Sequence, residues 1–253
     1  MTRRIWIAAA AILAAGVLVV AVVVLGRAAA RTTDATPTPT VTSPRASAPS
    51  ETPRVTDTPT SAPASTLLPV PRNAEGTARV LLTGDSLAAG FFATTEEQGF
   101  SALVADALGP VELTAVSRAH QTLTTVAGVT EVPPDLDLAV IELGTNDVGI
   151  PTPLADFDAQ YTDLVARIRA SSPRAALVCA GTWTSDGAAY DDIIARVCTA
   201  SEGHYVSLAE LFATPELRGP DGRDTFVGPG DDFHPNDAGH RAIADAVLAV
   251  LAR

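Results

Sequence analysis

Several residue types are scarce or missing in this 253-residue chain. It has no lysine, two cysteines and one methionine, and aromatic residues make up 5% of it. Its globular part, residues 76–253, holds 10 arginines against 25 acidic residues, a net charge of −15. Because phosphate binding needs a basic surface, this acidic part argues against a nucleic acid partner.

The two cysteines, Cys179 and Cys198, both lie in this acidic part. They are too few to close a zinc site, and their spacing is not that of a zinc motif, so we expect no metal. In an exported protein a single pair suggests a disulfide. Two buried free thiols are the alternative.

The N-terminus holds the longest apolar run of the chain, from Ile5 to Gly26. This length spans a bilayer as a helix and exceeds the usual apolar core of a cleaved signal peptide. We therefore predict a transmembrane signal anchor over residues 1–27. Cleavage after the small residues Ala28–Ala30, which would release a secreted protein, is the alternative.

Residues 28–75 are rich in threonine, proline, serine and alanine and have few large apolar side chains. Such a segment cannot bury a core, so we predict a disordered linker, whose composition also suits an O-glycosylated stalk. The domain would then stand outside the cell, held near the membrane.

Residues 76–253 alternate between apolar strands and amphipathic helices. Strands separated by helices indicate parallel pairing with right-handed crossovers, which predicts a three-layer α/β domain. The expected strands are Ala78–Leu82, Val111–Val116, Leu136–Ile141, Ala175–Ala180 and Tyr205–Leu208. The expected helices are Glu96–Leu108, Leu154–Ala170, Tyr190–Thr199 and a last one from Asn236 to the end of the chain.

Ser86 follows the first of these strands, in the turn Thr83-Gly84-Asp85-Ser86-Leu87. Sites of α/β enzymes lie at the carboxyl ends of the strands, where a nucleophile is expected. A serine attacks only if a base takes its proton and donors stabilise the oxyanion. The rest of the chain must supply these groups.

The best candidate base is His234, in a loop before the last helix, with Asp231 three residues earlier. An acid at this position can turn back to the second ring nitrogen and fix the tautomer, as a triad requires. A surface loop with an incidental histidine and acidic helix-capping residues is the alternative. Asn146, after another buried strand, could donate to an oxyanion, although Gly-Asn-Asp sequences are also common in turns.

Taken together, three motifs resemble, in order, the blocks of the SGNH (GDSL) hydrolase family. They are GDSL at residues 84–87, GTND at 144–147 and DxxHPN at 231–236. The resemblance covers essentially the whole globular part and implies a flavodoxin-like parallel sheet of five strands, with no cofactor. It also implies that Ser86 is the nucleophile, His234 the base and Asp231 its partner, with the Ser86 N–H and Asn146 as oxyanion donors.

One family block differs in this chain. It normally carries a glycine whose N–H completes the oxyanion hole, but the loop from Ser117 to Thr125 has none. The best alignment places Thr122 there. A backbone N–H survives the change, provided that a β-branched residue adopts the required dihedral angles.

The resemblance implies a serine esterase that acts through an acyl-enzyme. The predicted membrane tether favours short-chain O-acyl esters of carbohydrates or of the cell envelope, on an acylated small molecule or glycan. A lipase or thioesterase, an acyltransferase, and a non-catalytic glycan-binding module are the alternatives. Trp183 could line the substrate site, although a core or rim position is the usual one for tryptophan. We expect a monomer.

Overall fold

A sheet of five parallel strands organises the structure, a computed structural model that describes residues 67–252. The strands are β2 (Ala78–Gly84), β3 (Val111–Ser117), β4 (Leu138–Glu142), β5 (Ala176–Ala180) and β6 (His204–Val206). Their order across the sheet is β3-β2-β4-β5-β6, with every pair parallel. This order confirms the predicted five-stranded parallel α/β sheet.

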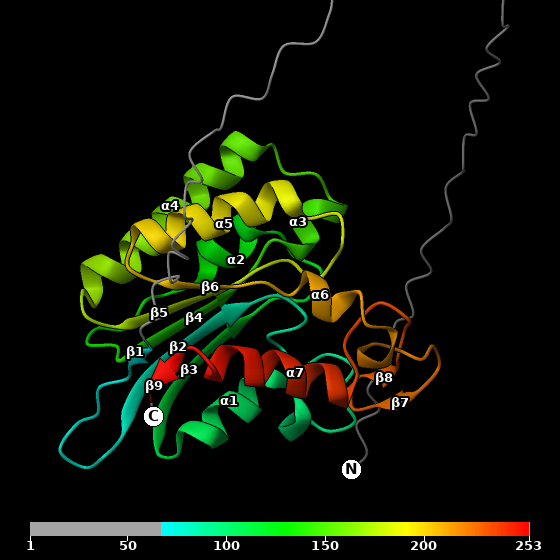
Figure 1. Cartoon of the computed structure of the whole chain (residues 1–253), viewed down its shortest axis with the longest axis horizontal. Coiled ribbons are helices and arrows are strands. Elements are labelled where there is room, and N and C mark those ends of the chain that lie inside the picture. The colour runs from blue at the N-terminus through cyan, green and yellow to red at the C-terminus, as the bar shows by residue number, and fades with distance from the viewer. Residues whose placement is uncertain (1–66, 253) are drawn as a thin grey trace, which may run out of the picture. The chain divides into compact units, whose positions relative to one another are not determined.

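Helices cover both faces of this sheet and complete three layers (Figure 1). One face packs against α1 (Phe100–Leu108) and α7 (Asp237–Leu248). The other packs against α2 (Leu123–Val129), α4 (Leu154–Ser171) and α5 (Ala188–Ala200). Alternate strand residues point to opposite faces: Val80 and Leu82 join the first core, and Leu81 joins the second.

Several short elements were not predicted from the sequence. They are the 3-10 turn η2 (Pro215–Leu217), the helices α2, α3 (Thr145–Gly149) and α6 (Ala209–Phe212), and the hairpin of β7 (Asp224–Thr225) and β8 (Gly228–Pro229). The 3-10 turn η1 (Glu96–Gln98) falls within a predicted helix. The predicted helix over 96–108 is interrupted at Gly99, which has an extended conformation and separates η1 from α1. All these elements are too short to carry a clear hydrophobic period.

Strand pairing within the described residues begins before residue 76, the predicted start of the domain. Leu68–Pro69 (β1) pairs in parallel with Leu251–Ala252 (β9), so the linker does not extend to residue 75 and the last helix does not reach the end of the chain. The reason is apolar burial, because Leu68 and Val70 pack against the core.

The predicted transmembrane segment over 1–27 and the rest of the predicted linker lie outside the described residues. Within residues 67–252, no helix combines the length and the apolar character that crossing a membrane requires.

A disulfide joins Cys179 of β5 to Cys198 of α5, with an Sγ–Sγ distance of 2.11 Å. The predicted bridge is therefore confirmed, and the alternative of two free thiols is wrong. Both cysteines are fully buried, so the bridge fixes α5 to the sheet from within the second core.

The carboxyl ends of the central strands bring distant parts of the sequence together. Gly84, the last residue of β2, pairs with Glu142 of β4 on one side and with Ser117 of β3 on the other. A side chain at position 84 would not fit, since its Cβ would lie 2.6 Å from the Glu142 carbonyl oxygen. The turn after β2 and the loop after β4 therefore emerge side by side.

Candidate active site

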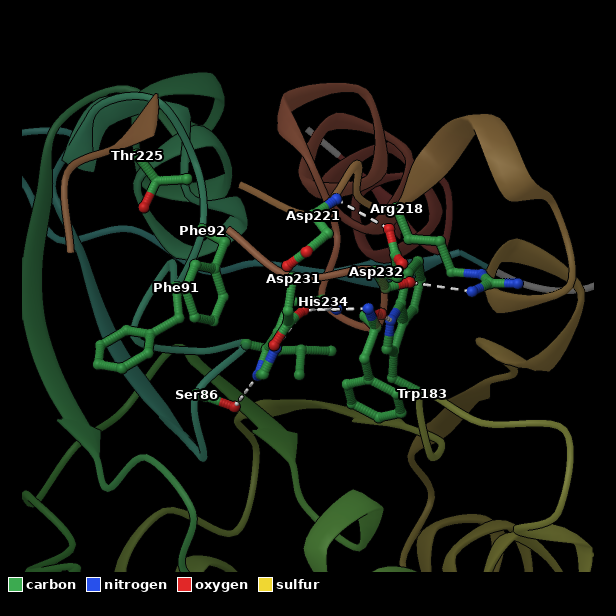
Figure 2. A network of polar contacts seen from close by, with 12 residues as sticks. Ser86, Phe91, Phe92, Trp183, Arg218, Asp221, Thr225, Asp231, Asp232 and His234 are labelled. Atoms are coloured by element: carbon green, nitrogen blue, oxygen red, sulfur yellow. Dashed lines mark hydrogen bonds and ion pairs between the residues drawn. The ribbon is translucent and has the colours of Figure 1, made fainter. Parts of the chain in front are cut away.

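Ser86 lies in the turn that follows β2, and its side chain faces His234 (Figure 2). The turn is closed by two backbone hydrogen bonds, from Ala89 N to Asp85 O (3.1 Å) and from Phe91 N to Ser86 O (2.9 Å). Ser86 Oγ lies 3.0 Å from His234 Nε2. The structure thus brings together the two residues that the sequence assigned as nucleophile and base.

Asp231 holds the other side of the imidazole. Its Oδ2 accepts the His234 Nδ1–H at 2.8 Å, and its Oδ1 accepts the backbone N–H of His234 at 2.8 Å and of Phe233 at 3.0 Å. With a proton on Nδ1, the free lone pair on Nε2 points at the serine hydroxyl. These three residues form the hydrogen-bonded chain of a Ser-His-Asp triad.

The protonation states of His234 and Asp231 suit proton transfer. Burial lowers the pKa of His234, an effect that the neighbouring Asp231 only partly offsets, so the imidazole is neutral and ready to accept a proton near pH 7. Burial raises the pKa of Asp231, but its hydrogen bonds from the His234 backbone and ring outweigh this effect and lower it overall. Asp231 is therefore ionised, as an orienting acid must be.

The histidine loop is held by side chains that bind its backbone carbonyls. Trp183 Nε1–H donates to Phe233 O at 2.8 Å, and Arg218 Nη1–H donates to Asp232 O at 2.9 Å. Asn236 caps α7 by accepting from Gly239 N at 3.1 Å, while its amide donates to carbonyls of the segment 216–219. These bonds fix the backbone immediately before and after His234, and Figure 2 shows how Trp183 and Arg218 approach the loop.

Trp183 consequently belongs to the core and not to the substrate surface. Its side chain is fully buried, which corrects the idea that it lines the substrate site. Its indole contacts the ring of Phe212 edge to face, with centroids 5.7 Å apart. Its contact with the histidine loop is the hydrogen bond to the Phe233 carbonyl.

Some backbone N–H groups around the nucleophile turn have no acceptor among the described residues, and two of them could face an oxyanion. They belong to Ser86 itself and to Thr122, which immediately precedes α2. Thr122 has φ −76° and ψ 168°, an extended conformation that any L-residue adopts without strain. The β-branched side chain of Thr122 therefore places no strain on the backbone at this position.

The Asn146 side chain lies at the same edge, half-buried at the start of α3. Its Nδ2 donates to Asp85 Oδ2 at 3.0 Å and to the carbonyl of Gln121, next to Thr122, at 3.1 Å. The amide is thus placed between the nucleophile turn and the Thr122 loop, and its two N–H groups have acceptors within the protein.

Two buried carboxyl groups under the nucleophile turn were not singled out from the sequence. Asp85 and Glu142 are both fully buried, and burial raises the pKa of Asp85 to about 6 and that of Glu142 well above its usual value. The sequence did place Glu142 directly after a buried strand, which was the available sign of a buried acid.

A second buried histidine, His240 of α7, binds the backbone of the segment that follows the nucleophile turn, at Phe91 and Phe100. Its Nε2–H donates to Phe91 O at 2.9 Å and its Nδ1 accepts from Phe100 N at 3.3 Å. Burial lowers its pKa to about 4, which keeps it neutral. Phe92, held at φ 64°, then brings its ring to 4.6 Å from the His234 ring.

The model of the GDSL-like lipase/acylhydrolase family matches residues 82–242. No curated protein sequence matches the chain.

Solved structures of the same fold include an extracellular lipase from Streptomyces rimosus, with 16% identity and a TM-score of 0.53 over 68% of this chain and 99% of that one. A phospholipase A1 from Streptomyces albidoflavus has 15% identity and a TM-score of 0.53 over the same shares of 68% and 99%. A carbohydrate esterase family 2 enzyme from Corynascus thermopiles (Myceliophthora fergusii) has 20% identity and a TM-score of 0.52, over 71% and 67%. At these identities the likeness concerns the fold.

Proposed function

The chain belongs to the GDSL-like lipase/acylhydrolase family, and on this premise we propose that it is an extracellular serine esterase that removes short acyl groups from carbohydrate or cell-envelope esters. The observation that carries the proposal is the continuous hydrogen-bonded chain from Ser86 through His234 to Asp231. Its distances of 3.0 and 2.8 Å lie within the range for direct proton transfer.

The reaction follows from this geometry. His234 Nε2 takes the Ser86 proton while Oγ attacks the ester carbonyl, and the resulting oxyanion is stabilised by the N–H groups of Ser86 and Thr122. The Asn146 amide joins them by exchanging its bond to the Gln121 carbonyl for one to the oxyanion, while it keeps its bond to Asp85. His234 then gives the proton to the leaving alcohol. Water, activated by the same imidazole, hydrolyses the acyl-enzyme and restores Ser86.

A pocket beside Asn146 supports a sugar as the alcohol part of the ester. It has a volume of about 350 Å³ and lies between α3 and the histidine loop. Its walls include the ring of Phe233, which is 37% exposed, and the polar side chains of Thr184 and Asp186. A sugar ring has apolar C–H faces and polar hydroxyl groups, so this combination of walls suits it.

A lipase or thioesterase is the second candidate, and one observation favours it. The turn of the β7–β8 hairpin carries Phe226 and Val227, which are 36% and 37% exposed, and Phe226 lies edge to face with Phe91 at 6.5 Å. These apolar side chains could contact a long acyl chain. Acyl transfer would use the same triad with an acceptor other than water.

Hydrolysis of 4-nitrophenyl esters of increasing chain length by the full chain, beside Ser86→Ala, tests the proposal. We expect the highest kcat/KM on acetyl or butyryl esters, activity on acetylated glycans, and none in the variant. A maximum at long chains would favour the lipase. If the wild type is as inactive as the variant on every ester, including acetylated glycans, the esterase proposal fails.

The extracellular location is tested separately. It rests on the apolar run over 5–26 and the threonine- and proline-rich segment after it. We expect protease added to intact cells that express the full chain to remove the domain. Complete protection of a cell-associated domain would contradict this location.

A further inference from the structure

Beneath the nucleophile turn lies a pair of carboxyl groups that the reaction described above does not use. Asp85 precedes Ser86, and Glu142 is the last residue of β4, in register with Gly84. Both are fully buried. The ion pairs found among residues 67–252 include neither of them, so no cation compensates their charge there.

Hydrogen bonds connect this pair to the parts that would hold an oxyanion. Glu142 Oε2 accepts the backbone N–H of Asp85 at 3.4 Å and of Ala88 at 3.3 Å, on either side of Ser86. Asp85 Oδ1 accepts Leu87 N–H at 3.0 Å, and its Oδ2 accepts the Asn146 amide at 3.0 Å. The two carboxyl groups thus hold both the Ser86 turn and Asn146.

The buried pair keeps one proton near neutral pH. Two adjacent carboxylates without a cation do not both ionise in a buried site. Burial raises both pKa values. Both oxygens of Asp85 accept N–H groups, from Leu87 and from Asn146, so Asp85 is the better placed of the two to keep the charge and Glu142 to keep the proton. The other ionisable groups that face the pair are the carboxyl of Asp147 and the buried hydroxyl of Tyr161.

Glu142 Oε1 has no hydrogen-bonding partner among the described residues, and neither has the Tyr161 hydroxyl. An ionised carboxylate in this place would leave a buried charge unsatisfied on one oxygen, which is costly. A neutral carboxyl group that donates to Asp85 avoids this cost. The geometry therefore agrees with a proton on Glu142.

We propose that Glu142 is a neutral positioning residue that donates its proton to Asp85 in a hydrogen bond and thereby holds the Ser86 turn and the Asn146 amide in place for oxyanion stabilisation. This inference rests on the proposed esterase function. Because the oxyanion exists only after attack, misplaced donors lower kcat and leave KM nearly unchanged.

Two substitutions of Glu142 distinguish a role of its proton, as a hydrogen-bond donor, from a role of a negative charge. Glu142→Gln keeps an N–H donor for Asp85 and an oxygen for the Asp85 and Ala88 N–H groups, whereas Glu142→Leu removes both. On 4-nitrophenyl acetate at pH 7.5 we expect Glu142→Gln to keep kcat within about threefold of wild type. We expect Glu142→Leu to lose about 100-fold in kcat, the size of losing one oxyanion donor, with KM within about threefold.

The matched controls are Glu112→Gln and Glu112→Leu. Glu112 lies on β3 with its side chain 71% exposed, and its partner is Arg79, remote from the site. Both controls should keep wild-type kcat. A loss of kcat in Glu142→Gln as large as in Glu142→Leu would overturn the proposal, because it would mean that a negative charge is needed.

Infrared difference spectroscopy provides a readout that does not depend on activity. At pH 7.5 we expect the C=O stretch of a buried protonated carboxyl group in wild type and in Glu112→Gln, and its absence in Glu142→Gln. Absence of this band in wild type would overturn the proposal even if Glu142→Leu fails to fold. If wild type shows the band but hydrolyses no ester, the esterase proposal fails and the protonation of Glu142 stands.

Discussion

Two aspartates flank the Ser86–His234 hydrogen bond, and the fold treats them in opposite ways. Asp231 has a side chain that is 43% exposed, accepts three N–H groups and has a lowered pKa. Asp85 is fully buried, and burial raises its pKa to about 6. Asp231, which must be charged, lies where water and N–H groups stabilise its charge. Asp85 is buried, and its charge depends on the proton that Glu142 holds.

The two regions also differ in what holds them. The nucleophile turn continues the strand β2, which is paired with β3 along its whole length and with β4 from Val80 to Gly84, so the sheet itself fixes the turn. The histidine loop lies beyond the sheet and is held by individual bonds from Trp183, Arg218 and Asn236 to its carbonyls and to the segment beside it. Single substitutions should therefore disturb the histidine loop more easily.

The largest effect is expected for Asp231→Asn. Loss of the charged acceptor allows the wrong imidazole tautomer, and we expect kcat to fall by about 10³- to 10⁴-fold on 4-nitrophenyl acetate. The neighbouring Asp232 accepts Asp221 N–H at 2.8 Å and has no contact with the His234 ring, so Asp232→Asn is the matched control, with an expected loss below about fivefold. Equal losses in the two variants would contradict the assignment of Asp231.

The second largest effect is expected on the pH dependence of stability, through His240. This residue of α7 binds the Phe91 carbonyl, which follows the nucleophile turn. Its folded-state pKa of about 4 lies below the ordinary value of 6.5, so the unfolded chain takes up this proton first. The stabilisation is complete above pH 6.5 and is lost as the pH falls toward 4. This difference corresponds to about 3 kcal/mol of unfolding free energy.

Denaturant unfolding of wild type and His240→Gln at several pH values from 6.5 to 4 measures this loss of stability. We expect the variant to lack this part of the acid destabilisation. His120→Gln, at an exposed histidine, should follow wild type. If His240→Gln has the same pH dependence as wild type, His240 is not the buried neutral histidine described above.

The smallest effect is expected for Trp183→Phe, which tests the histidine loop alone. The change keeps most of the buried volume and removes the hydrogen bond to the Phe233 carbonyl. We expect the free energy of unfolding to fall by about 1–3 kcal/mol and kcat to fall by about fivefold. An unchanged kcat in a destabilised variant would show that this bond does not position His234.

The sequence was most informative where the signal is local. Strands such as Leu138–Glu142 are short apolar runs, and the order of the three motifs points to Ser86, His234 and Asp231, which the fold brings into hydrogen-bonding contact. By contrast, α2 has β-branched residues and a glycine, which are poor helix formers. Its first N–H, that of Leu123, is capped by the side chain of Asp147 in α3. Such a helix depends on a tertiary contact that no local pattern reveals.

The same limit applies to the site. The buried pair of Asp85 and Glu142 arises from the strand register that sets Gly84 beside Glu142, and the sequence alone does not give that register. The position of Trp183 is likewise decided by the histidine loop that packs over it. The motifs predicted the three residues that the fold joins in one hydrogen-bonded chain, whereas the groups that bind to this chain required the fold.

The most direct test of the central claim is mass spectrometry of the full chain after treatment with a fluorophosphonate. An activated serine forms a covalent adduct with this reagent whatever its natural substrate. We predict a single adduct on Ser86 in wild type, none in Ser86→Ala, and slow labelling in Asp231→Asn. An unlabelled wild-type chain, or labelling that persists in Ser86→Ala, would contradict the assignment of Ser86 as a nucleophile activated by His234 and Asp231.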